Sequence, residues 1–245
     1  MLIAVWGRDG IGKSTLCDAL GMLFAKQGIT VIIDTDLTQP TLPVRLNGSK
    51  FEAERSLGRA VSGIGANDAS RYLHQHTNQK SLFYAGLTNM DEYLSYEIGL
   101  EADNAAQNFV ELCVEIADTV ILDLSGQRTD PFVPGALIHA DSIITMFTPH
   151  VEGFCWYKSV EHLLETMSAQ ERIVPVFSMV ERHSDIYAIE KADGIQFTIS
   201  LPYVQEFRHI HGTGATPMDG TTPAALRYVR QVRNLGTLLK GDDSQ

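Results

Sequence analysis

A glycine-rich segment near the start of the chain has the residue types that bind phosphate. Residues 7–14 read GRDGIGKS and fit the pattern G-x-x-x-x-G-K-[ST]. Glycines let the backbone turn so that successive N–H groups point at an anion, and a helix starting at Lys13 adds the partial positive charge of its N-terminus. Lys13 is expected to reach the β- and γ-phosphates of a nucleotide, and the Ser14 hydroxyl to bind Mg²⁺. The pattern therefore predicts a nucleotide-binding loop.

An aspartate that could hold the magnesium shell lies at the end of an apolar segment. Asp123 closes the strand-like residues 119–123, and Gly126 follows three residues later. The backbone N–H of a glycine at this point can contact a γ-phosphate and move when that phosphate leaves. The alternative interpretation is an ordinary turn in which Asp123 caps the next segment.

Two more carboxylates follow a second apolar segment, residues 30–34. Asp34 and Asp36 are two residues apart, so strand alternation points them the same way, and one could be buried while Asp36 faces the nucleotide. A carboxylate there can bind a metal-bound water or orient an attacking one. We predict Asp36 to be catalytic, and to form the metal site together with Ser14 and Asp123.

Strand-like and helix-like segments alternate along the chain. The predicted strands are residues 1–6, 30–34, 81–85, 119–123, 142–147, 172–179 and 195–199. The predicted helices are residues 13–28, 52–62, 67–76, 105–116 and 222–239, and residues 37–50 are predicted to be a loop. A further helix is predicted after residue 147, with Val160, Leu163, Leu164 and Met167 facing inward. This alternation predicts an α/β fold with a mostly parallel central sheet and helices on both faces. We expect residues 1–240 to be a single P-loop domain and residues 241–245 a polar tail.

The composition is that of a globular protein in a reducing compartment. The chain has 245 residues, 44% of them hydrophobic, and a net charge of −11, which gives no general attraction to DNA or anionic lipid. Cys17, Cys113 and Cys155 lie in apolar patterns without disulfide or zinc spacing, so each is expected to be buried. No signal peptide or membrane-spanning stretch is evident, and we expect a cytoplasmic protein.

Together these segments resemble the MinD/ParA family of ATPases, which includes the nitrogenase iron protein. The family's loop usually reads G-K-G-G-x-G-K-[ST]-T, which is similar to residues 7–15. Its Asp-x-Asp resembles residues 34–36, and its switch II Asp-x-x-Gly resembles residues 123–126. Residues 140–149 are similar to its strand and Thr-Pro segment, and residues 200–203 to its Ile-Pro-Tyr stretch near the adenine. The resemblance extends to about Leu239 and is weakest over residues 51–103.

The resemblance implies an ATPase that uses Mg²⁺ and dimerises around ATP to hold a partner complex. Lys13, Asp36 and Arg8 are the catalytic residues that it implies. The nucleotide-binding residues that it implies are Arg8, Asp9, Gly10, Ile11, Gly12, Lys13, Ser14, Thr15, Gly126, Ser178, Pro202 and Tyr203.

Three positions depart from the family pattern. Arg8 stands where the family has a lysine that reaches the partner's phosphates, and a guanidinium also grips phosphate. Asp9 stands where the family has a glycine, and its negative charge should weaken ATP binding unless a cation offsets it. Ser178 lies where the family usually has an asparagine for adenine. Irregular loops are known in TadZ/CpaE-type pilus-assembly members, which this chain resembles on that point.

Other functions remain open at this stage. A metal-inserting or electron-transferring ATPase would need cysteines at a dimer face, and no such cluster is evident. A nucleotide-binding scaffold with little turnover is a further alternative. The partner could belong to a partition, division-site, pilus or secretion machine. Arg227, Arg230 and Arg233 in the last helix could contact a membrane, but core packing of that helix with its arginines in water is favoured.

Overall fold

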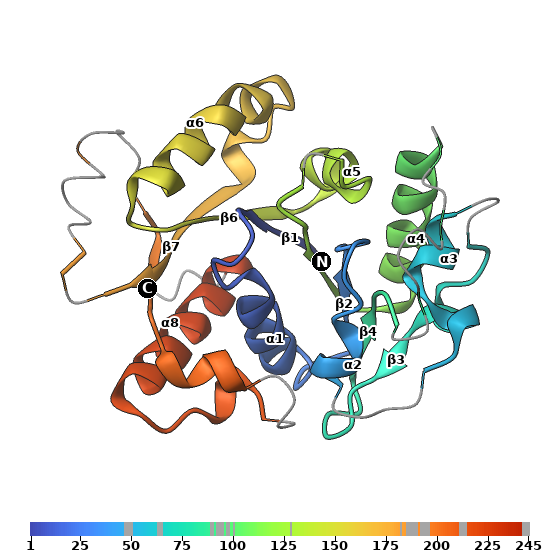
Figure 1. Cartoon of the computed structure of the whole chain (residues 1–245), viewed down its shortest axis with the longest axis horizontal. Helices are drawn as coiled ribbons and strands as arrows, with labels where there is room; N and C mark the ends of the chain where they lie inside the picture. The colour runs from blue at the N-terminus through green and yellow to red at the C-terminus, as the bar shows by residue number, and fades with distance from the viewer. Residues whose placement is uncertain are drawn as a thin grey trace.

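The strands form one twisted sheet that crosses the whole molecule (Figure 1). The structure is a computed structural model, and it describes the chain except residues 47–50, 63–65, 89–90, 92–95, 97–98, 100, 128, 182, 185–190, 192–196, 211–214 and 242–245. The strand order is β3-β4-β2-β5-β1-β6-β7-β8. The strands are β1 (Leu2–Gly7), β2 (Thr30–Asp34), β3 (His74–Gln75), β4 (Leu82–Ala85), β5 (Thr119–Asp123), β6 (Ser142–Phe147), β7 (Ile173–Val180) and β8 (Ile199–Pro202). Only β3 and β4 pair antiparallel among the described strands, which confirms the predicted mostly parallel sheet.

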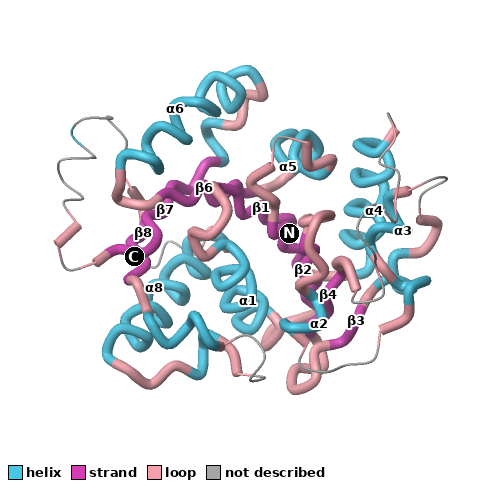
Figure 2. The backbone as a smooth tube through the Cα atoms, viewed as in Figure 1, coloured by secondary structure: helices cyan, strands magenta, loops and turns pink. Residues whose placement is uncertain are grey.

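Helices cover both faces of this sheet, as predicted (Figure 2). On one face lie α1 (Lys13–Phe24), α2 (Leu42–Arg45) and α8 (Pro223–Leu239). On the other lie α3 (Leu57–Val61), α4 (Ala102–Ile116), α5 (Phe132–His139) and α6 (Val151–Thr166). Single 3₁₀ turns are η1 (Ala53–Arg55), η2 (Ala69–Tyr72), η3 (Gln170–Arg172), η4 (Gln205–His209) and η5 (Pro217–Asp219).

The central strands are apolar on both sides because both sides are covered. In β1, Ile3 and Val5 pack in the core beneath α1 and α8. Leu2, Ala4 and Trp6 point the other way, into the core beneath α4, α5 and α6. The unbroken apolar run that opens the chain thus fills two cores at once.

The sheet brings its acidic strand ends to one edge. β1 lies between β5 and β6, so the strand order reverses at β1, and ligands of such sheets bind at the carboxyl ends of the strands beside this point. In register, Asp123 of β5 is opposite both Val5 of β1 and Asp34 of β2. The end of β1 leads into the glycine-rich loop. Three segments far apart in sequence therefore meet at one place.

Most predicted elements are confirmed within a few residues, and two helices are additional. α2 lies in residues 37–50, which were predicted to be a loop, and α5 was not predicted. β8 begins at Ile199, later than the predicted strand over 195–199, whose residues 195–196 lie outside the described part of the chain. The predicted polar tail also lies outside it, apart from Gly241.

The structure does not confirm the two helices that were predicted between residues 52 and 76. The helix predicted over 52–62 is divided into η1 and α3 at Ser56, whose backbone is extended with ψ 142°. The helix predicted over 67–76 is wrong, because this stretch contains the short 3₁₀ helix η2 followed by the strand β3. β3 pairs with β4 at the edge of the sheet, and this long-range pairing outweighs the local pattern.

Burial of the cysteines was predicted for all three and holds for two. Cys17 and Cys113 are buried, whereas Cys155 is exposed. Cys155 belongs to α6, which buries only Gly153 and Leu164 among its sixteen residues. The helix rests on the sheet along a narrow stripe, so Cys155 faces outward. Within the described residues, no helix combines the length and the apolar character needed to cross a membrane.

Candidate nucleotide site

The glycine-rich loop presents free backbone donors at the start of α1. Gly10 and Gly12 have φ angles of 77° and 91°, a left-handed conformation that favours glycine. Gly12 is the N-cap of α1 and supplies no side-chain cap, and the first turn contains no acidic residue. The N–H groups of that turn therefore remain available to an anion.

The loop lysine is buried and already holds a carboxylate. Lys13 is 7% exposed, and its Nζ lies 2.8 Å from the Arg8 carbonyl oxygen and 3.1 Å from Asp9 Oδ1. The same Asp9 oxygen accepts a hydrogen bond of 2.8 Å from the backbone N–H of Gly126. Three residues that the sequence singled out are thus joined in one contact.

Beneath the loop, three carboxylates surround one buried guanidinium. Arg45 donates to Asp123 Oδ2 at 2.8 Å, to Asp34 Oδ2 at 3.1 Å and to Asp18 Oδ1 at 2.6 Å. Tyr84 also donates to Asp18 at 3.0 Å. Sequence reasoning missed Arg45, because it lies in a segment predicted to be a loop and no motif marks it.

Burial and charge act in opposite directions in this cluster. Burial raises the pKa of Asp34 to about 6, with Asp123 adding to the shift, while Arg45 and Thr41 pull that pKa down. Burial would lower the pKa of Arg45, but the surrounding carboxylates outweigh it and raise that pKa. Arg45 is therefore a permanent cation, and its charge opposes the rise that burial causes in the pKa of Asp34.

Asp36 lies at the mouth of the site, whereas Asp34 lies at its base. Asp36 is half-buried, lines the cavity and accepts a hydrogen bond of 2.8 Å from the Thr38 N–H. Asp34 is 6% exposed and accepts from Thr41 and Arg45. The catalytic role of Asp36 stays a prediction.

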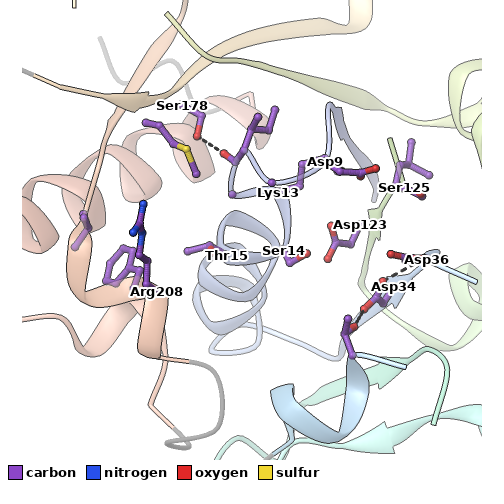
Figure 3. Close-up of a pocket in the computed structure, with 18 of the residues that line it drawn as sticks. Asp9, Lys13, Ser14, Thr15, Asp34, Asp36, Asp123, Ser125, Ser178 and Arg208 are labelled. Atoms are coloured by element: carbon purple, nitrogen blue, oxygen red, sulfur yellow. Dashed lines mark hydrogen bonds and ion pairs between the residues drawn. The ribbon is translucent and has the colours of Figure 1, made fainter. Parts of the chain in front are cut away.

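The oxygen ligands suit magnesium. Ser14, Asp36 and Asp123 all line the same cavity (Figure 3). A hydroxyl and carboxylates are the hard ligands that Mg²⁺ takes, usually through its water shell. Asp123 engages Arg45 through Oδ2, so its Oδ1 is the oxygen left for that shell.

The cavity continues to a second, more apolar wall. Its volume is about 660 Å³, and the loop closes one side while η4, α8 and the ends of β7 and β8 close the other. Ser178 does not face this space freely, since its Oγ donates to the Ile11 carbonyl oxygen at 2.6 Å. Met179 beside it has a φ of 55°, a strained conformation for a side chain of this size.

Most of the predicted binding residues come together in this cavity. Those that line it are Asp9, Gly10, Ile11, Gly12, Lys13, Ser14, Thr15, Asp36, Asp123, Ser178, Pro202 and Tyr203. Gly126 reaches it through Asp9. Arg8 is exposed and does not line the cavity of its own chain.

Several lining residues near the apolar wall were not predicted, among them Phe207, Arg208 and Tyr228. Phe207 and Arg208 directly follow the Pro-Tyr stretch, so proximity in sequence could have suggested them. Tyr228 comes from α8, and its hydroxyl is buried with no hydrogen-bond partner among the described residues. A buried hydroxyl of this kind can bind a polar ligand.

A buried network holds the segment after β5 in place. The Ser125 N–H donates to Thr35 Oγ1 at 2.9 Å and to Asp130 Oδ2 at 3.0 Å, and Thr35 Oγ1 donates to the same carboxylate. Asp130 also accepts from the Phe132 N–H at 2.8 Å. Burial raises the pKa of Asp130 to about 6, against these hydrogen bonds. Gly126 is therefore presented to Asp9 by an anchored backbone.

Three solved structures of two protein types, MinD and a ParA family ATPase, have this fold. MinD from Aquifex aeolicus, in complex with MinC, matches with a TM-score of 0.75 at 16% identity, covering 100% of this chain and 97% of that one. MinD from Pyrococcus horikoshii, complexed with Mg-ADP, gives 0.76 at 13% identity, covering 100% and 99%. A ParA family ATPase from Chlorobium tepidum gives 0.72 at 13% identity, covering 95% and 98%. No family model matches the chain, and no curated protein matches it in sequence. The chain therefore has the fold of MinD and ParA.

Proposed function

We propose that this protein is a Mg²⁺-dependent ATPase of the MinD/ParA type that works as a nucleotide-controlled switch. The observation that carries the proposal is the gathering of Lys13, Ser14, Asp36 and Asp123 around one cavity at the carboxyl ends of β1, β2 and β5. The MinD of the same fold that is complexed with Mg-ADP supports the choice of ligand.

Binding and catalysis would be electrostatic. The N–H groups at the start of α1 and the ammonium group of Lys13 would hold the phosphates, and Ser14 and Asp123 would hold Mg²⁺ and its water shell. Bound Mg²⁺ would neutralise charge that develops on the phosphates. Asp36 would orient the attacking water from the mouth of the cavity.

ATP would close a homodimer that recruits a partner complex. Arg8 supports this step, because it is charged, exposed and outside its own cavity, as a residue reaching the phosphates of a second copy would be. The partner would be a division-site, partition, pilus or secretion component in the cytoplasm, and MinD of the same fold forms a complex with MinC. The acidic net charge disfavours DNA as that partner.

The position of Arg45 favours slow hydrolysis of ATP. Its guanidinium binds Asp123, so the carboxylate of the metal shell is shared with a fixed internal cation. A metal-delivering function has less support. Of the three cysteines, two are buried, and the described residues hold no group of three metal-binding side chains that could form a cluster.

Phosphate release from ATP tests the proposal. The wild-type protein with Mg²⁺ should release phosphate, and Asp36→Ala should lower the rate about tenfold or more while ATP still binds. Asp103→Ala on the exposed start of α4 is the matched control and should keep the wild-type rate. Equal rates of phosphate release for wild type and Asp36→Ala would show that Asp36 has no catalytic role. If wild type released no phosphate from ATP, the protein would not be an ATPase.

A further inference from the structure

One oxygen of Asp9 occupies the place between the two donors that a γ-phosphate would use. Asp9 Oδ1 lies 3.1 Å from Lys13 Nζ and 2.8 Å from the Gly126 backbone nitrogen. The loop lysine and the glycine after the strand-end aspartate are the groups that bind a terminal phosphate in P-loop sites. In the view of Figure 3, Asp9 lies between Lys13 and Ser125. An internal anion thus bridges the two groups that would bind a terminal phosphate.

The contact is close but can be released. A Cβ added to Gly126 would lie 2.7 Å from Asp9 Oδ1 and 2.8 Å from Asp9 N, so the two backbones are in direct apposition. The Asp9 side chain is 64% exposed, in contrast to the 7% of Lys13. Asp9 can therefore rotate into solvent without disturbing the core, while Lys13 stays in place.

We propose that Asp9 acts as an internal substitute for the γ-phosphate and makes the site selective for nucleoside diphosphates over triphosphates. The inference rests on the proposed function, since it needs a nucleotide in this cavity. A diphosphate leaves the terminal position to Asp9. A triphosphate brings a third phosphate to Lys13 and Gly126 and must expel a carboxylate of like charge.

Displacement of Asp9 by a triphosphate would also signal to the rest of the protein which nucleotide is bound. In the diphosphate state, Gly126 stays bonded to the loop through Asp9, and the segment after β5 keeps its arrangement on Thr35 and Asp130. In the triphosphate state, Gly126 would exchange an internal partner for the ligand. Binding of a terminal phosphate would thereby change the contacts of the segment between β5 and α5.

Calorimetry with ADP and an ATP analogue carrying an imido β–γ bridge tests this selectivity. Asp9→Asn removes the charge and keeps the shape, and Asp9→Gly removes both. Both variants should lower the ratio of the analogue's Kd to the ADP Kd about tenfold or more, which is about 1.4 kcal/mol. The ADP Kd itself should stay within about threefold. Glu115→Gln, an exposed change on α4 outside the cavity, removes the same charge and should leave the ratio at its wild-type value.

The amide resonance of Gly126 gives a second readout. ADP should leave it near its position in the free protein, and the analogue should shift it. An unchanged ratio in both Asp9 variants, with both nucleotides bound, would overturn the inference and leave the proposed function intact. Absence of binding by wild type and variants alike would overturn both. Tighter binding of the analogue by both Asp9 variants than by wild type, with the ADP Kd unchanged, would support the inference.

Discussion

Arg45 is the cation that neutralises the buried carboxylates beneath the phosphate-binding loop. It is surrounded by Asp18, Asp34 and Asp123, all of them buried. Removal of one partner from a buried ionic cluster leaves uncompensated charges, which costs about 3–5 kcal/mol. The guanidinium therefore holds together one helix and two strands, α1, β2 and β5, through their carboxylates.

Replacement of Arg45 by methionine should destabilise the fold strongly. We expect the free energy of unfolding in urea to fall by about 3–5 kcal/mol, because three carboxylates lose their cation. Arg230→Met is the control, since Arg230 is exposed on α8, and it should change stability by less than about 0.5 kcal/mol. A loss for Arg45→Met no larger than for the control would contradict the cluster's role.

Asp130 gives the fold a dependence on pH. Burial raises the pKa of its carboxyl to about 6, above the value of about 3.9 for an exposed aspartate. The folded state therefore favours the protonated form, so the stability that Asp130 contributes is complete at low pH and is lost as the pH rises through about 6. Relative to Asp130→Asn, wild type should gain about 1 kcal/mol of unfolding free energy between pH 7 and about pH 5. A difference between the two proteins that does not vary with pH would refute this.

At the scale of elements, the hydrogen bond from Ser178 ties β7 to the phosphate loop. Its Oγ donates to the Ile11 carbonyl across 167 positions of sequence and is buried. This bond fixes the loop at the turn where its glycines take positive φ. The loop is thus held from β7 as well as by its own strand and helix.

Ser178→Ala should therefore weaken nucleotide binding through the loop. Loss of one buried hydrogen bond of about 1 kcal/mol predicts an ADP Kd about fivefold higher, measured by calorimetry. Ser200→Ala, a change of the same size on β8, is the control and should bind ADP as wild type does. Equal ADP affinities for the two variants would show that the bond does not position the loop.

Local patterns predicted the elements whose residues lie together in sequence. β1, the glycine-rich loop and α1 form one continuous segment, and β5 ends in Asp123, three residues before Gly126. Each of these could be read from a strand, a turn and a helix in succession. Their meeting at one edge follows from a parallel sheet.

The remaining features depend on partners distant in sequence. β3 forms because β4 lies beside it, and the pattern of residues 67–76 alone favoured a helix. Arg45 contacts Asp34 and Asp123 from α2, and Tyr228 lines the cavity from α8. No sequence motif marks either residue. The bridging role of Asp9 needs Gly126, 117 residues away. Such contacts follow from tertiary packing.

At the scale of the whole molecule, the proposed switch needs two copies of the chain around ATP. Light scattering should show a shift from monomer to dimer when ATP and Mg²⁺ are added, and Arg8→Ala should abolish this shift because the partner's phosphates lose a cation. Arg227→Ala is the control, an exposed arginine of α8, and should dimerise as wild type does. Dimerisation of Arg8→Ala at the wild-type ATP concentration would exclude Arg8 from the interface.

The proposed function depends on capture of a nucleotide by the loop before α1 and the ammonium group of Lys13. Calorimetric titration with Mg²⁺ and ATP or ADP tests it most directly. Wild type and the exposed-site control Lys26→Ala should bind one nucleotide per chain, and Lys13→Ala should bind none. A nucleotide affinity of Lys13→Ala equal to that of wild type would contradict the proposed function. So would the absence of any heat of binding from wild type at about millimolar nucleotide.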